Sequence, residues 1–261
     1  MSGAASEGGA AIPPPLPPPP RPSPADRLIV ALDLPSLGEA ETLVALLGEH
    51  ATAFKIGYQL LPLGGYDLAR RLHARGKRVF LDAKLYDIGA TVERGVRSIA
   101  QNGADMLTVH ADPDTVRGAV EGAAAGAGGG TRPDILAVTV LTSWNEATLR
   151  AHGIEGSVET LVLRRAEIAA EHGADGVIAS AEEARAIRAR FGDRLKIVTP
   201  GIRPIGADAD DQKRITTPAM AINAGADALV VGRPITKAQS PVAEVVSIVN
   251  EIAAVVREDE G

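Results

Sequence analysis

The chain has 261 residues, of which 45% are hydrophobic, so it is long enough for one α/β barrel or for two small domains. Its net charge is −6 and no basic cluster offsets it, which argues against a nucleic-acid-binding surface. It contains no cysteine, which excludes disulfide bonds, thiolate metal sites and a cysteine nucleophile.

The first 25 residues differ in composition from the rest of the chain. They consist mostly of small residues and prolines, with an almost unbroken proline run from Pro13 to Pro20. Such a segment cannot fold around a core, so we expect residues 1–25 to be a disordered tail and residues 26–261 to form one catalytic domain. No stretch reaches the ~18 apolar residues of a membrane span, and we expect a soluble, cytoplasmic protein.

From Arg27 onward, short apolar runs alternate with amphipathic segments of helical length. The apolar runs are Leu28–Leu32, Ala53–Ile56, Val79–Leu81, Met106–Val109, Ile135–Val140, Gly176–Ala179, Lys196–Val198 and Ala228–Val231. The helix-like segments include Leu37–Glu49, Tyr66–Arg75, Thr91–Asn102 and Val158–His172. Eight such repeats predict parallel βαβ units closed into a (β/α)₈ barrel, with an open doubly wound sheet as the alternative.

Two further patterns concern the connections between these elements. Gly-Ala-Asp occurs at residues 103–105, 173–175 and 225–227, each time just before a predicted strand, where the glycine suits a helix C-cap and a tight turn. We assign these three motifs a structural role. The segments Gly122–Thr131 and Arg203–Gln212 are rich in glycine or polar residues and are expected to be mobile loops.

The third apolar run ends in two charged residues, Asp82 and Lys84. Because side chains alternate along a strand, these two point to the same face while Ala83 points to the other. Burying a charge costs several kcal/mol unless a partner offsets it, so this arrangement favours a catalytic acid and base over a structural ion pair.

Other polar residues also stand at the ends of predicted strands. In a barrel the active site is built from residues at the carboxyl ends of strands. The residues at these positions are Asp33, Lys55, Asp82, Lys84, His110, Thr142, Ser143, Arg203, Gly232 and Arg233. Their convergence from separate strands predicts one active site.

The ends of the seventh and eighth strands predict a phosphate site. Pro200-Gly201-Ile202-Arg203 follows one strand and Gly232-Arg233 the other. Glycine lets an anion approach backbone N–H groups, and arginine offers a bidentate fork to phosphate oxygens. Gln212, on the segment between them, would close over the ligand; two solvated surface arginines are the simpler alternative.

With these residues the sequence resembles the orotidine 5′-phosphate decarboxylases from about Arg27 to Val256. The motifs that carry the resemblance are Val30-Ala31-Leu32-Asp33, Phe54-Lys55-Ile56-Gly57, Asp82-Ala83-Lys84-Leu85-Tyr86-Asp87-Ile88, Val140-Leu141-Thr142-Ser143, Thr199-Pro200-Gly201-Ile202-Arg203-Pro204, Asp210-Asp211-Gln212-Lys213-Arg214 and Val231-Gly232-Arg233-Pro234-Ile235. The resemblance implies a homodimeric barrel that converts orotidine 5′-phosphate to uridine 5′-phosphate without a metal or organic cofactor.

Carried over residue by residue, the resemblance also implies individual roles. Lys55, Asp82 and Lys84 would form a line of alternating charge, with Lys84 as proton donor and Asp87 added from the partner subunit. Further residues would contact the substrate: Asp33 and Lys55 the ribose, Thr91 the nucleotide across the dimer, Thr142 and Ser143 the pyrimidine, and Arg203, Gln212, Gly232 and Arg233 the phosphate. The family's Pro-Asn after Asp-Ile is Gly89-Ala90 here, which predicts a looser loop around Thr91.

Three alternative functions remain open. A decarboxylase or aldolase of the same barrel group that acts on a sugar phosphate with a divalent metal would carry an acidic ligand where Lys55 stands. A catalytically silent nucleotide-binding barrel would keep the phosphate residues but would not need four alternating charges. A scaffold organised by the proline-rich tail predicts that removal of residues 1–25 abolishes function, whereas we expect that deletion to be neutral.

Overall fold

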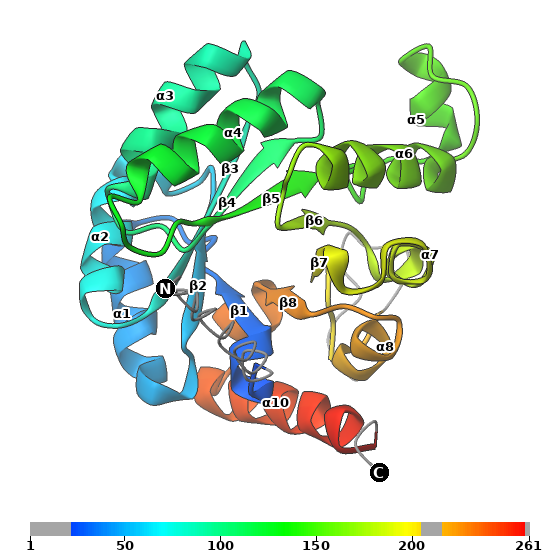
Figure 1. Cartoon of the computed structure of the whole chain (residues 1–261). Helices are drawn as coiled ribbons and strands as arrows, with labels where there is room; N and C mark the ends of the chain where they lie inside the picture. Colours follow the sequence, from blue (N-terminus) through cyan, green and yellow to red (C-terminus); the bar gives the residue numbers. More distant parts are fainter. Residues whose placement is uncertain (1–21, 205–215, 259–261) are drawn as a thin grey trace, which may run out of the picture.

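The computed structural model describes residues 22–204 and 216–258, in which parallel strands close into a barrel in chain order (Figure 1). The strands are β1 (Leu28–Ala31), β2 (Ala53–Ile56), β3 (Arg78–Leu85), β4 (Met106–His110), β5 (Asp134–Val138), β6 (Gly176–Ile178), β7 (Lys196–Pro200) and β8 (Ala228–Val231). The predicted (β/α)₈ barrel is confirmed over the open sheet, because β1 also pairs with β8, with Ile29 opposite Val230.

Helices surround the barrel on its outside (Figure 1). They are α1 (Leu37–Leu47), α2 (Gly65–Ala74), α3 (Gly89–Ala100), α4 (Pro113–Gly126), α5 (Glu146–Ala151), α6 (Val158–Glu171), α7 (Ala181–Phe191), α8 (Pro218–Asn223), α9 (Arg233–Thr236) and α10 (Pro241–Glu258), with 3-10 turns η1 (Pro24–Arg27), η2 (Gly48–His50), η3 (Leu61–Leu63) and η4 (Gly192–Arg194). Side chains cap several helix starts; Ser36 Oγ, for example, accepts the N–H of Glu39 at 3.2 Å before α1. Within the described residues, no helix is both long and apolar enough to cross a membrane.

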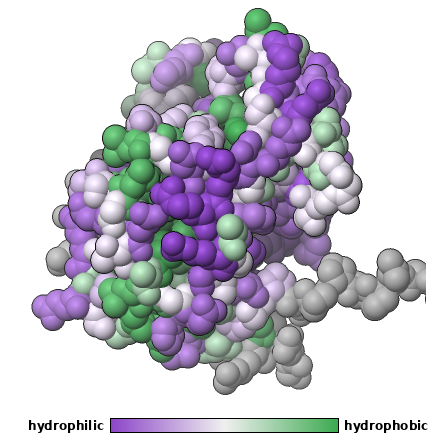
Figure 2. Space-filling view, turned by 90° about the vertical axis from the view of Figure 1, so that its left-hand side faces the viewer, coloured by the Kyte–Doolittle hydropathy of each residue, from purple (hydrophilic) through white to green (hydrophobic). Residues whose placement is uncertain are grey.

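The core has two layers because alternate strand residues point to opposite faces. Inward-facing residues such as Ile29, Phe80 and Leu136 fill the barrel, while a larger apolar layer packs between the strands and the helices. The helices turn their apolar stripes toward the strands. On the side of the molecule that carries α1 and α2, Figure 2 accordingly shows hydrophilic side chains over the centre and separate apolar patches around them.

The three Gly-Ala-Asp motifs share one structural role at the amino-terminal end of the barrel. The carboxylates of Asp105, Asp175 and Asp227 each accept the backbone N–H near the start of the preceding strand, at 2.7, 2.8 and 2.7 Å respectively. The glycine of each motif adopts a positive φ, as the predicted turn requires. Each aspartate therefore ties an even-numbered strand to its neighbour.

Several segment boundaries differ from the sequence-based predictions. The third strand, for example, continues to Leu85 rather than ending at Leu81. The segment Gly122–Thr131 was expected to be a loop, but α4 continues to Gly126. Gly122 and Gly126 belong to this helix and, lacking a Cβ, lie close to the backbone of α3. Regular structure also begins within the predicted tail, since η1 starts at Pro24. Of the predicted loop Arg203–Gln212, residues 205–212 lie outside the described residues.

Candidate active site

A cavity of about 400 Å³ opens at the carboxyl ends of the strands. Its polar lining comes from Asp33, Lys55, Asp82, Lys84, Thr142, Ser143, Arg203 and Arg233, and its apolar lining includes Phe80, Val138, Val140, Leu141, Ile178 and Val230. The tertiary structure therefore brings together the polar residues that the sequence placed at the ends of six separate strands.

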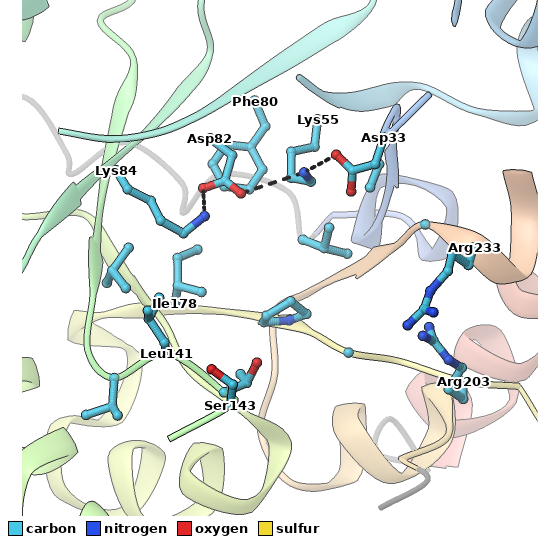
Figure 3. Close-up of a pocket in the computed structure, with 18 residues that line it drawn as sticks. Asp33, Lys55, Phe80, Asp82, Lys84, Leu141, Ser143, Ile178, Arg203 and Arg233 are labelled. Carbon is cyan, nitrogen blue, oxygen red and sulfur yellow. Dashed lines mark hydrogen bonds and ion pairs between the residues drawn. The ribbon is translucent and has the colours of Figure 1, made fainter. Parts of the chain in front are cut away.

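Four charged side chains of alternating sign form a row along one wall of this cavity (Figure 3). Lys55 Nζ lies 2.9 Å from Asp33 Oδ1 and 3.6 Å from Asp82 Oδ2, and Lys84 Nζ lies 2.7 Å from Asp82 Oδ1. The side chains of Lys55 and Asp82 are only 10% and 15% exposed. We call Asp33, Lys55, Asp82 and Lys84 the charged row.

The centre of the charged row is an ionised carboxylate. Burial acts to raise the pKa of Asp82, but the ammonium groups of Lys55 and Lys84, with hydrogen bonds from Lys84 and Thr108, outweigh it and hold the pKa below the ordinary 3.8. Asp82 is thus available as a negative charge at neutral pH, placed between two cations.

Lys84 has an unusual backbone. It is the only non-glycine residue with a positive φ (44°) among those the structure describes, and the pairing of β3 with β4 shifts register between Leu81 and Leu85. Tyr58 supports this bulge from outside, because its hydroxyl donates to the carbonyl of Ala83 at 3.0 Å and its ring lies 5.8 Å from Lys84 Nζ.

The two arginines lie at the end of the cavity away from Lys84, with their guanidinium groups directed toward each other (Figure 3). Arg203 follows β7 and is only 7% exposed, and Arg233 begins α9 directly after β8. Gly232 and Gly201 line the same end of the cavity. This end therefore concentrates positive charge next to accessible backbone, which suits a phosphate.

The loop between β5 and α5 carries the predicted ring-binding residues Thr142 and Ser143, and both line the cavity. Trp144 supports this loop: its backbone N–H donates to the carbonyl of Leu141 at 2.8 Å, and its ring stacks on His152 with centroids 4.6 Å apart. The loop thus presents two hydroxyl groups from a supported position.

Four predicted residues are not gathered into the cavity of this chain. His110 ends β4 but is not part of the described lining, so its predicted convergence with the other strand-end residues is wrong. Asp87 and Thr91 are exposed and are not part of the described lining, and Asp87 Oδ1 instead accepts the N–H of Ile88 at 2.6 Å. Gln212 lies outside the described residues. Gly89 does not have a positive φ; a Cβ there would lie 2.9 Å from the carbonyl oxygen of Asp114, so this glycine serves close packing against α4.

Sequence reasoning missed two features of the site. The apolar wall of Val138, Val140 and Ile178 was recognised only as strand, although inward-facing positions on β5 and β6 mark it. Gly57 was taken only as part of a motif, yet a Cβ there would lie 2.9 Å from Lys55 Nζ. The absence of a side chain at Gly57 leaves room for that ammonium group.

The comparisons with known proteins agree with this geometry. Residues 26–248 match the model of the orotidine 5′-phosphate decarboxylase / HUMPS family. The chain belongs to this family. Orotidine 5′-phosphate decarboxylases from Rhodopseudomonas palustris (strain BisA53) and Methylobacterium sp. (strain 4-46) are 56% and 55% identical, covering 87% and 88% of this chain and 94% and 97% of the relatives.

Solved structures of the family agree as well. The crystal structure of orotidine 5′-phosphate decarboxylase from Lactobacillus acidophilus superposes with a TM-score of 0.78 at 36% identity, covering 89% of this chain and 99% of that one. The predicted family resemblance is therefore confirmed over the barrel, whereas the proline-rich segment lies outside the matched residues.

Proposed function

We propose that this chain decarboxylates orotidine 5′-phosphate to uridine 5′-phosphate and CO₂, the last step of de novo UMP biosynthesis, without a metal or organic cofactor. The observation that supports the reaction best is the charged row together with two arginines in one cavity. Family membership and relatives named for this activity support it independently. A cytoplasmic location remains part of this proposal.

The reaction breaks the bond between C6 of the pyrimidine and its carboxylate carbon. The bonding electron pair stays on C6, CO₂ leaves, and a proton must then reach C6. Lys84 is the donor in this proposal, because its ammonium group stands at the cavity end of the charged row, 2.7 Å from Asp82. The proton passes from Nζ to C6, and the lysine is left neutral until solvent reprotonates it.

Catalysis by this arrangement is mainly electrostatic. C6 has no neighbouring carbonyl to accept its electron pair, so the enzyme must favour the transition state through fixed charges. A substrate carboxylate beside Asp82 is repelled in the ground state, and that repulsion disappears as CO₂ departs. The Lys84 ammonium stabilises the charge that develops on C6, and little reorganisation is needed because hydrogen bonds already hold both groups.

The remote phosphate contributes binding energy that orients the ring. Arg203, Gly232 and Arg233 would hold the phosphate, with Gln212 closing over it, while Thr142 and Ser143 would bind the pyrimidine. Asp33 and Lys55 would contact the ribose. Lys55 also argues against the metal-dependent sugar-phosphate alternative, because its ammonium group occupies the place of the acidic ligand and repels a cation.

We include a homodimer in the proposal, with Asp87 and Thr91 reaching into the partner's site. The loops next to the charged row expose large side chains, with Tyr58 at 63%, Tyr86 at 68% and Ile88 at 76% exposure. Such exposed apolar residues next to Asp87 favour a protein–protein contact there. A second copy of this chain would cover them and add a carboxylate to the row.

The activity is tested by mixing EDTA-treated protein with orotidine 5′-phosphate and following the loss of substrate absorbance. We expect decarboxylation at the same rate with and without EDTA. Activity that requires added metal would support the metal-dependent alternative, and tight nucleotide binding without turnover would support the silent barrel.

Lys84→Ala separates chemistry from binding. We expect kcat to fall by at least about 10³-fold, because the proton donor is lost, while uridine 5′-phosphate still binds. Arg233→Ala is the contrasting variant and should lower kcat/KM mainly through a higher KM, since it weakens the hold on the phosphate. Near-normal turnover by Lys84→Ala would refute the role of that lysine.

The shared site is tested by mixing two inactive variants, Lys84→Ala and Asp87→Ala. In a mixed dimer one site combines the intact Lys84 of one chain with the intact Asp87 of the other. Random exchange should therefore restore about a quarter of the wild-type activity. No recovery, although an affinity-tagged chain co-purifies the untagged variant and so shows that mixed dimers form, would place Asp87 and Lys84 of the same chain in one site.

A further inference from the structure

Thr108, on β4, contacts the backbone of Lys84 and the carboxylate of Asp82 and is itself fully buried. Its Oγ1 accepts the backbone N–H of Lys84 at 2.9 Å and donates to Asp82 Oδ1, also at 2.9 Å. Neither the family resemblance nor the strand-end pattern singles out this residue, because it stands inside a strand among apolar neighbours.

The pairing between β3 and β4 explains why a hydroxyl is needed at this position. Leu81 pairs with Leu107 and Leu85 pairs with Val109, so the three residues Asp82 to Lys84 stand opposite the single residue Thr108. This bulge and the positive φ of Lys84 take its N–H out of the regular ladder. A buried N–H without a partner is costly, and Thr108 Oγ1 supplies that partner.

The two hydrogen bonds of the hydroxyl depend on each other. Because Oγ1 accepts from Lys84, its own proton is directed to another acceptor, and Asp82 Oδ1 is in place. The same oxygen of Asp82 accepts from Lys84 Nζ at 2.7 Å, while Oδ2 faces Lys55. One hydroxyl thus joins the backbone of the proton donor to the carboxylate beside it.

We propose that Thr108 is a positioning residue, which fixes the bulge at Lys84 and the orientation of the Asp82 carboxylate so that both keep their places during decarboxylation. The inference rests on the proposed decarboxylase function. It assigns Thr108 no contact with substrate, and it requires the hydroxyl group rather than the volume of the side chain.

Thr108→Val tests the proposal, because it keeps the shape and removes both hydrogen bonds. We expect kcat to fall about 10- to 100-fold, since misplacement of a reacting group by about 1 Å costs that much, with the affinity for uridine 5′-phosphate nearly unchanged. Thr108→Ser keeps the hydroxyl and should retain most of the activity. A normal kcat for Thr108→Val, or an equal loss in Thr108→Ser, would overturn the proposal.

Thr139→Val is the matched control. Thr139 directly follows β5, is also fully buried, and donates its Oγ1 hydrogen bond to the carbonyl of Ile178 at 2.8 Å rather than to the charged row. It should lose comparable stability but keep kcat. If both valine variants lower kcat equally at equal Tm, Thr108 has only a structural role.

A pH profile supplies a readout that loss of stability alone would not move. The hydrogen bond from Thr108 lowers the pKa of Asp82, so its removal raises that pKa. The acid limb of the kcat/KM profile should therefore move to higher pH in Thr108→Val and stay in place in Thr139→Val. An unmoved acid limb in Thr108→Val would count against the proposal.

Should Thr108→Val fail to fold, Thr108→Cys provides the same test, because a thiol is a weak donor and acceptor of similar size. We expect a reduced kcat and a shifted acid limb, and an unchanged kcat would overturn the proposal. A wild-type enzyme that never consumes orotidine 5′-phosphate would instead disprove the underlying function, whatever Thr108 does.

Discussion

His110 ends β4 beside the charged row without being part of it. Its ring is half-buried, lies 5.4 Å from the ring of Tyr86, and faces the cations of Arg165 and Lys84. Burial, followed by these two positive charges, lowers its pKa below the ordinary value of 6.5. The folded protein therefore holds His110 in the neutral state at neutral pH.

The lowered pKa predicts how stability depends on pH. In the unfolded chain His110 takes up a proton near pH 6.5, whereas in the folded chain it does so only at lower pH. The free energy of unfolding therefore decreases as the pH falls below about 6.5. His110→Gln should remove this contribution. Urea unfolding of both proteins at about pH 7.5 and about pH 5.5 measures it.

Asp82 does not affect this measurement, because its pKa lies below 3.8 and its contribution to the free energy of unfolding is lost only in stronger acid. The free energy lost between the two pH values should be smaller in His110→Gln than in the wild type. An equal loss in both proteins would show that other groups govern stability in this range.

At the scale of elements, α3 and α4 pack unusually closely through glycines. Gly118, Gly122 and Gly126 are spaced four residues apart on one face of α4, and they meet the carbonyl oxygens of Gly89, Glu93 and Arg97 on α3. A Cβ on Gly126 would lie 2.6 Å from the oxygen of Arg97, and those on the other two would overlap their carbonyls. Glycine is therefore required by lack of space.

Gly122→Ala should destabilise the protein by about 1–3 kcal/mol, because the added methyl group forces two backbones apart. Gly95→Ala is the matched control, since that glycine is also helical but a Cβ there has open space, so alanine should be neutral or stabilising by about 0.5–1 kcal/mol. Thermal unfolding compares the two variants. A stable Gly122→Ala would mean that the helices separate at little cost.

At the scale of the whole molecule, the proline-rich segment lies outside the family match. The family match begins at residue 26, and the described contacts begin close before it: Ser23 caps η1, and its Oγ accepts the N–H of Asp26 at 3.3 Å. Asp26 in turn accepts a hydrogen bond from Thr52. The contacts of the folded domain therefore begin at Ser23, three residues before the family match.

Deletion of residues 1–21 should leave kcat/KM and Tm unchanged. Deletion of residues 1–25 removes the Ser23 cap as well and should cost about 1 kcal/mol of stability without loss of activity. Steady-state kinetics and thermal unfolding of the two truncated proteins check both statements. Loss of activity on the shorter deletion would favour the scaffold alternative.

The sequence by itself determined eight parallel βαβ units, because the alternation of apolar runs and amphipathic segments is local. The pairing of β1 with β8 in the tertiary structure decided for the closed barrel over the open sheet. The helices it predicted agree with the structure to within two residues. Asp82 and Lys84 both line the cavity as predicted, although a bulge at Lys84 interrupts the regular alternation of the strand. Together with the family motifs, strand-end position was enough to find the charged row and the two arginines.

Only the tertiary structure decided what depends on contacts between distant segments. The three-to-one bulge opposite Thr108, the space that Gly57 leaves for Lys55, and the glycine face of α4 have no local signature. From the sequence alone, Thr108 and these glycines cannot be distinguished from ordinary strand, helix or loop residues, because their spatial neighbours are not known. Local patterns determine which way a side chain points, whereas packing determines what it meets.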